Sequence, residues 1–185
     1  MTGPCFFNED FQFSLGSRQR MDLELLRQVI PNCVEVVKSD TALDKLGIDY
    51  VATLDGGAKI YIDAKSRRKG ASKRWKDGIP LLALEVWSVC PDGRNKGKPG
   101  WTVNRNTECD MILYTFDRED TDKFYLFPFQ HLRMAFQHNY KEWKTRFGTR
   151  CQFNGNYYSE CMFVPAPLVI DAISAEMTGL NKLVV

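Results

Sequence analysis

The clearest alternation of apolar and polar residues in the chain falls between residues 47 and 67. It predicts two strands, at about 48–54 and 58–65, joined by an Asp55-Gly56-Gly57 turn of the kind that closes hairpins. Side chains two residues apart share one face of a strand. The second strand therefore has an apolar face, made of Ala58, Ile60, Ile62 and Ala64, and a polar face, made of Lys59, Tyr61, Asp63 and Lys65. We expect the apolar face to enter a core.

Hydrophobic spacing elsewhere predicts further strands between helices. The additional strands are expected at residues 33–38, 79–89, 101–104, 110–116 and 123–127, with a hairpin at 151–164. The helices are expected at residues 17–30, 129–146 and 167–177. Ser17 would cap the first helix and Pro31 would end it. This order predicts a mixed α/β (α+β) domain around one sheet, mainly antiparallel at its start.

The length of 185 residues predicts a single domain spanning 1–185, with a core at about 17–130 and a helical and hairpin extension at about 130–185. No apolar run approaches the roughly 20 residues that cross a bilayer, so no membrane partner is expected. The six cysteines form no C-x-x-C pair and follow no secretory leader, which favours reduced thiols in a cytoplasmic compartment. His131 and His138 are expected to be structural.

The net charge of +2 is too small to indicate a nucleic-acid partner, but the positive charge is concentrated after the second predicted strand. Cations there would hold phosphates through salt-sensitive attraction, and an aromatic ring can stack on an unpaired base. Alternatively, the stretch is a solvated loop and Trp75 belongs to the core. The residues predicted to contact DNA, including branched or single-stranded DNA, are Arg67, Arg68, Lys69, Lys73, Arg74, Trp75 and Lys76.

Two carboxylates and one amine are candidates for chemistry. Asp49 on the first strand of the hairpin can meet Asp63 and Lys65 on the second. Converging carboxylates bind a hard cation such as Mg²⁺ or Mn²⁺, and an adjacent lysine suits phosphodiester hydrolysis. The alternatives are an ordinary aspartate at the start of a strand and a solvent-facing strand with alternating charge. Glu85, in an apolar strand, would either be a further metal ligand or pair with an arginine.

The order of a helix, a strand, a strand with Asp49 and a strand with Asp63-Ala64-Lys65 resembles the PD-(D/E)XK nuclease superfamily, and in particular its Holliday-junction-resolvase-type and phage-type members. The resemblance implies a restriction-endonuclease-like central mixed sheet flanked by helices. It also implies that Asp49, Asp63 and the Ala64 carbonyl hold the metal, that Lys65 orients the water or stabilises the transition state, and that cleavage leaves a 5′-phosphate. The implied setting is the cytoplasm of a bacterial or phage-infected cell.

The chain departs from that family pattern in two places. The second acid is Asp63, where glutamate is frequent, and the acid expected on the first helix falls near Gln19 or Arg20. Asp22 or Glu24 would have to replace it from nearby. The sequence therefore predicts a Mg²⁺-dependent DNA endonuclease. The alternatives are a catalytically weak or inactive nuclease-fold module that binds DNA or a host protein, and a structural subunit of a larger assembly. A homodimer is compatible with either of the first two functions.

Overall fold

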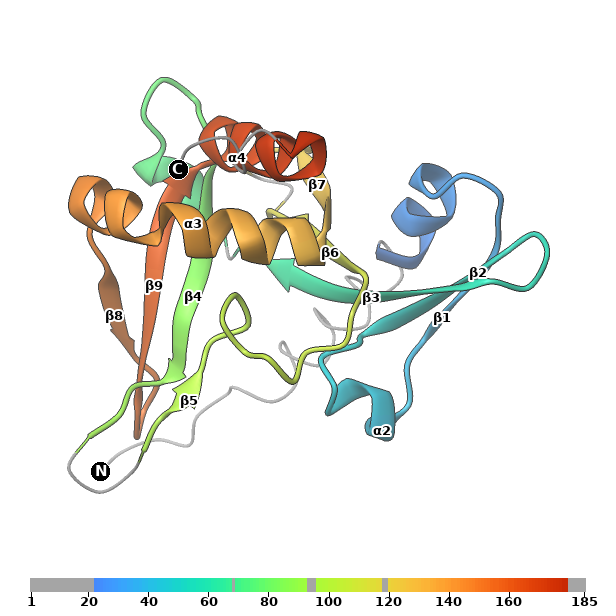
Figure 1. The fold of residues 1–185 in the computed structure, drawn as a ribbon, viewed down its shortest axis with the longest axis horizontal. Coiled ribbons are helices and arrows are strands. Elements are labelled where there is room, and N and C mark those ends of the chain that lie inside the picture. Colours follow the sequence, from blue (N-terminus) through green and yellow to red (C-terminus); the bar gives the residue numbers. More distant parts are fainter. Residues whose placement is uncertain (1–21, 68, 93–95, 118–119, 180–185) are drawn as a thin grey trace, which may run out of the picture.

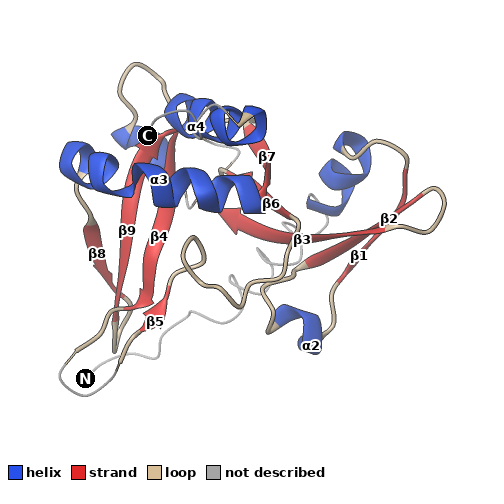
Figure 2. Cartoon of the chain, in the orientation of Figure 1, coloured by secondary structure: helices blue, strands red, loops and turns tan. Residues whose placement is uncertain are grey.

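The computed structural model describes residues 22–67, 69–92, 96–117 and 120–179, and within them the chain has a mixed α+β fold. It contains a five-stranded mixed sheet and a second, four-stranded sheet, with helices packed against them (Figures 1 and 2). The expected α/β class is confirmed. The expectation of one sheet is wrong, because the chain divides its strands between two.

The first sheet has the order β1-β2-β3-β6-β7. Its strands are β1 (Cys33–Lys38), β2 (Tyr50–Leu54), β3 (Lys59–Ser66), β6 (Met111–Thr115) and β7 (Phe124–Pro128). Neighbouring strands are antiparallel except β3 and β6, which are parallel. The hairpin predicted between β2 and β3 is confirmed. Gly56 and Gly57 have φ values of 93° and 85°, a region where a side chain would be strained.

The second sheet has the order β5-β4-β9-β8. Its strands are β4 (Leu81–Val89), β5 (Lys98–Pro99), β8 (Arg150–Phe153) and β9 (Tyr158–Pro165). All three pairings in it are antiparallel. The edge of β3 away from β2 is occupied by β6, and β4 pairs instead with β9, an antiparallel partner from late in the chain.

The two long helices are α3 (Phe129–Phe147) and α4 (Ala166–Thr178). They pack against each other and against β9, and in Figure 1 they lie side by side across one end of the second sheet. Both helices were expected, as was the β8–β9 hairpin. The N-terminal helix covers 22–29 in the described part of the chain, and its expected cap, Ser17, lies outside that part.

Local structure differs from expectation in a few short segments. The strand expected at 101–104 is instead a turn, in which the N–H groups of Val103 and Asn104 donate to the carbonyl of Gly100 at 3.1 and 2.9 Å. Three short elements were not expected: α2 (Thr41–Asp44), a single 3₁₀ turn η1 (Ala71–Arg74) and β5. Elements of two to four residues carry too little periodicity to be recognised from sequence.

Two hydrophobic cores lie on opposite faces of the first sheet. The smaller core packs Ile60, Ile62 and Ala64 of β3 against the helix at 22–29, so the predicted apolar face of β3 is buried as expected. The main core lies between the two sheets and under α3 and α4. Tyr61 packs against the main core, on the same face of β3 as Asp63. The polar face of β3 is therefore covered around Tyr61 and Asp63, and Asp63 is only 2% exposed.

A side-chain hydrogen bond joins the two sheets through the main core. The backbone N–H of Ala83 in β4 donates to the hydroxyl of Tyr114 in β6 at 2.7 Å. Burial, which outweighs this hydrogen bond, raises the pKa of Tyr114, so its hydroxyl stays neutral. In the described part of the chain, no helix is both long enough and apolar enough to cross a bilayer.

Candidate active site

The β2–β3 hairpin brings Asp49 and Asp63 together, as the sequence predicted. Asp49 directly precedes β2, and its N–H donates to the carbonyl of Ile62 at 2.8 Å. Its carboxylate oxygen Oδ2 accepts the N–H of Ala64 at 2.8 Å. The two aspartate side chains are close enough to share a hydrogen bond, which is one of the interactions that shift the pKa of Asp63. The start of one strand thus places its carboxylate beside the middle of the next.

Lys65 completes the group. Its amine Nζ lies 2.6 Å from Oδ1 of Asp63, and its side chain is 29% exposed. Burial alone would lower the pKa of Lys65, but attraction to Asp63, and to Asp49 and Glu85, outweighs burial and raises it. The amine is therefore a fixed positive charge next to the carboxylate pair.

The environment of Asp63 favours a cation. Burial raises the pKa of Asp63 from its ordinary 3.8 to about 7, against the opposing effect of Lys65, and the neighbouring Asp49 raises it further. Two carboxylates this close resist ionising together unless positive charge is added between or beside them. Oxygen donors from two acids are the ligands that Mg²⁺ and Mn²⁺ prefer. The donor set of this site therefore fits a hard divalent cation.

The backbone adds a third oxygen at the same place. Ala64 N–H points toward Asp49, and in a strand the N–H and C=O of one residue face the same edge. The carbonyl of Ala64 therefore faces the edge of β3 where β2 begins and Asp49 lies. Among the described residues, no group of three or more Asp, Glu, His or Cys side chains forms a metal site, so the available set is two carboxylates and a carbonyl.

Glu85 lies near this group and forms no ion pair with an arginine among the described residues. Its carboxylate oxygen Oε2 accepts hydrogen bonds from the hydroxyl of Ser88 at 2.6 Å and from the N–H of Trp101 at 3.3 Å. Its backbone carbonyl accepts the hydroxyl of Thr102. Glu85 therefore holds the 100–102 turn against β4. It also contributes to the raised pKa of Lys65, which places its charge beside the candidate site.

A buried thiol borders the site and was not singled out from the sequence. Burial, with a contribution from the charge of Asp63, raises the pKa of Cys109 to about 12, so the thiol is neutral. Cys109 lies just before β6 and is 6% exposed. Only the parallel register of β3 and β6, which the sequence does not reveal, brings it next to Asp63.

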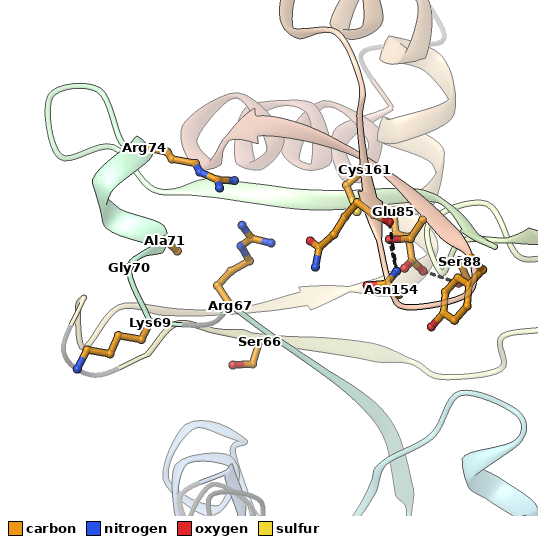
Figure 3. Close-up of a pocket in the computed structure, with 13 residues that line it drawn as sticks. Ser66, Arg67, Lys69, Gly70, Ala71, Arg74, Glu85, Ser88, Asn154 and Cys161 are labelled. Carbon is orange, nitrogen blue, oxygen red and sulfur yellow. Dashed lines mark hydrogen bonds between the residues drawn. The ribbon is translucent and has the colours of Figure 1, made fainter. Parts of the chain in front are cut away.

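The basic stretch after β3 lines one side of a cavity of about 580 Å³ that opens next to Glu85. Arg67, Lys69 and Arg74 line it, so three of the predicted DNA contacts are at one place. Figure 3 shows the guanidinium groups of Arg67 and Arg74 pointing into the same space, while Lys69 points away from it. The turn that carries these residues is held by Asp120, which accepts hydrogen bonds from Ala71 N–H at 2.8 Å and from the hydroxyl of Ser72 at 2.5 Å.

The remaining predicted contacts are distributed differently. Lys73 and Lys76 are exposed and do not line the cavity. Trp75 packs edge-on against Phe116, with ring centroids 5.2 Å apart, and against the main core, which is the core alternative left open by the sequence. Arg68 lies outside the described residues.

Asp22 and Glu24, the two acids considered as replacements for the missing acid of the first helix, have different surroundings from Asp49 and Asp63. Asp22 is 6% exposed and accepts a hydrogen bond from the hydroxyl of Tyr50 at 3.0 Å. Tyr50 belongs to the smaller core. Glu24 is exposed.

The site therefore combines a buried aspartate, Asp63, a half-buried one, Asp49, a lysine bound to Asp63 and a basic cavity alongside. No protein-family model, curated protein or solved structure matches this chain.

Proposed function

We propose that the protein is a Mg²⁺- or Mn²⁺-dependent endonuclease that hydrolyses phosphodiester bonds in DNA, as the resemblance to PD-(D/E)XK nucleases implies. The observation that carries the proposal is the convergence of Asp49, Asp63 and Lys65 from two adjacent strands. The three residues were chosen from the strand pattern of the sequence and from the resemblance to that superfamily, without knowledge of the fold. Charges placed by chance along exposed strands would not be expected to meet around a buried carboxylate, Asp63, beside a basic cavity.

In this proposal Asp49, Asp63 and the carbonyl of Ala64 hold the cation. When bound, such a cation would lower the pKa of a coordinated water and neutralise charge on the scissile phosphate. The ionised form of Asp63 is required for ligation, and its pKa of about 7 means that protons compete for the site near neutral pH.

Lys65 provides charge stabilisation in this proposal. Its amine is kept protonated by the surrounding acids and is held in place by Asp63 at 2.6 Å. A positive charge that is already oriented in a largely buried site stabilises developing negative charge more than a solvated one, because little reorganisation is needed during the reaction. Arg67 and Arg74 would hold the DNA backbone beside it through phosphate contacts.

A second function, binding of DNA without cleavage, is favoured by one observation. Lys65 already pairs with Asp63 directly, and the raised pKa of Asp63 lets that carboxyl keep a proton near neutral pH, so the charge of the group is compensated without a metal. A nuclease-fold module that had lost cleavage would have such a self-compensated site.

The deciding experiment incubates the full chain with plasmid, single-stranded and branched DNA in Mg²⁺, Mn²⁺ or EDTA. The variants are Asp63→Asn and Lys65→Ala. Matched controls are Asp55→Asn, in the exposed hairpin turn, and Lys59→Ala, at the exposed start of β3. Metal-dependent cutting that is lost in both site variants and kept in both controls supports the endonuclease. DNA binding without cutting, unchanged by Asp63→Asn, supports the binding module instead.

A further inference from the structure

The basic cavity has a second wall that the sequence did not indicate. Opposite Arg67 and Arg74, the β8–β9 hairpin contributes Gln152, Asn154, Tyr157 and Ser159 to the lining. These side chains are uncharged and carry amide and hydroxyl groups. In Figure 3 Asn154 lies across the cavity from Arg67, on the same side as Glu85 and Cys161. A positively charged wall therefore faces one made of uncharged polar side chains and the carboxylate of Glu85.

The tip of this hairpin exposes several aromatic rings. Phe153, Tyr157 and Tyr158 are 57%, 41% and 54% exposed. They surround a tight turn in which Asn154 N–H donates to the carbonyl of Tyr157 at 2.8 Å. The rings of Phe153 and Tyr158 pair across the strands with centroids 5.1 Å apart, which leaves Tyr157 as the aromatic residue that lines the cavity. Exposed aromatic rings that gather at one place commonly mark a binding surface.

The charged wall has unused capacity for an anion. The guanidinium of Arg67 lies 4.9 Å from the ring centroid of Phe163, and that of Arg150 lies 5.7 Å from the same ring. Nε of Arg67 is buried and has no hydrogen-bond acceptor within the described chain. No ion pair with Arg67 or Arg74 occurs between described residues. The carboxylate of Glu85 is already bound by Ser88 and Trp101.

We propose that this cavity binds single-stranded DNA, with a backbone phosphate between Arg67 and Arg74 and an unpaired base stacked on Tyr157. The inference rests on the proposed nuclease function and adds the form of the substrate. Stacking on an aromatic ring requires a base that is not already stacked within a duplex, and it is independent of sequence because every base has a π face. Asn154 and Ser159 would contact the base edge or sugar through hydrogen bonds. The adjacent Lys65 and Asp63 would then face the strand beyond the bound phosphate.

The binding test measures fluorescence anisotropy of the full chain in EDTA, so that cleavage does not interfere. The probes are a labelled single-stranded oligonucleotide of about 15 nucleotides and the same sequence as a duplex. Single-stranded DNA should bind more tightly than duplex. Tyr157→Ala should weaken single-stranded binding about tenfold and leave duplex binding unchanged, while Tyr157→Phe, which keeps the ring, should bind as wild type.

The arginine wall is tested in the same assay. Arg67→Gln should weaken the binding of both probes. For the single strand it should also reduce the slope of the log binding constant against log salt concentration by about 0.7. Arg146→Gln, at an exposed position of α3 outside the cavity, is the matched control. Unchanged duplex binding shows that Tyr157→Ala is folded. Wild-type affinity of Tyr157→Ala for the single strand, or a preference for duplex, would overturn the proposal.

A parallel cleavage assay separates this inference from the function on which it rests. If single-stranded DNA binds through Tyr157 but no cutting occurs with Mg²⁺ or Mn²⁺, the binding site stands and the endonuclease does not. The opposite result is that wild type cuts DNA and that Tyr157→Ala cuts and binds single-stranded DNA equally well. In that case the endonuclease stands and the single-strand site fails.

Discussion

The amine of Lys65 lies 2.6 Å from Oδ1 of Asp63, two residues earlier on the same strand face, in a position where Asp63 is 2% exposed. Because both faces of β3 are covered around Asp63, this ion pair is not part of a solvated strand edge. A carboxylate in such a place is costly unless it is neutralised by a cation or by a proton. The predictions that follow depend on how that charge is compensated.

Stability should depend on pH through Asp63. The pKa of Asp63 is raised from 3.8 to about 7 in the folded chain, so the folded state binds its proton more tightly than the unfolded state does. The contribution of protonated Asp63 to the free energy of unfolding is fully present below about pH 4 and is lost as pH rises toward about 7. Urea unfolding measures the free energy of unfolding of wild type and Asp63→Asn across this pH range. The free energy should fall with rising pH through this contribution only in wild type. Parallel curves would contradict the assigned pKa.

Divalent cations should reverse that loss. At about pH 8, Mn²⁺ or Mg²⁺ should raise the melting temperature of wild type, because ligand binding to the folded state adds about 2.7 kcal/mol at a concentration of 100 Kd. The increase should shrink at about pH 5.5, where protons compete for Asp63. Differential scanning fluorimetry measures both effects. Asp63→Asn should show no increase and Asp55→Asn should keep it, whereas equal increases in the two variants would place the cation elsewhere.

The hydrogen bond that joins the two sheets should contribute measurably to stability. Tyr114→Phe leaves the buried N–H of Ala83 without its partner at 2.7 Å, and such a loss costs about 1–3 kcal/mol. Tyr125→Phe is a control, since no hydrogen bond to the Tyr125 hydroxyl occurs between described residues, and it should change stability by less than about 0.5 kcal/mol. Chemical unfolding measures both. Equal stabilities would mean that the two sheets do not depend on this contact.

Gly100 should tolerate no side chain. A Cβ at this position would overlap the backbone carbonyl of Glu85, and the N–H of Gly100 already donates to the carbonyl of Val86 at 2.9 Å. Gly100→Ala should therefore destabilise the fold by about 3 kcal/mol. Gly57→Ala has no atom within 4 Å of the new Cβ and should cost only the left-handed backbone strain of about 1 kcal/mol. A thermal melt compares the two, and a smaller loss for Gly100→Ala would show that the 100–102 turn can move away from β4.

Much of the local structure was predictable because it is encoded over short distances. The Asp55-Gly56-Gly57 turn and the alternation along β3 are sufficient to predict the hairpin, and with it the meeting of Asp49 and Asp63. The apolar spacing along α3 is sufficient to predict that helix. Each of these signals lies within a few residues of the structure that it specifies.

Long-range pairing was not predictable in the same way. Nothing in the sequence around β4 shows that it pairs with β9, or that β3 takes β6 as a parallel neighbour. The error of a single sheet follows from this, and so do the unforeseen burial of Asp63 and the proximity of Cys109. The hairpin wall of the cavity was missed for the same reason. Tyr157 carries no chemical signal until the fold sets it opposite Arg67.

The pairing of β4 with β9 also has a consequence for synthesis on the ribosome. β1, β2 and β3 are contiguous, so both aspartates can be assembled while the chain is still emerging. One edge of β4 can pair only after β9 has been synthesised, and local contacts generally form before distant ones. Until then the nascent protein would hold the β2–β3 hairpin and its two acids without the opposite wall of the cavity. A ribosome stalled before residue 150 would therefore display Asp49 and Asp63 beside an incomplete cavity.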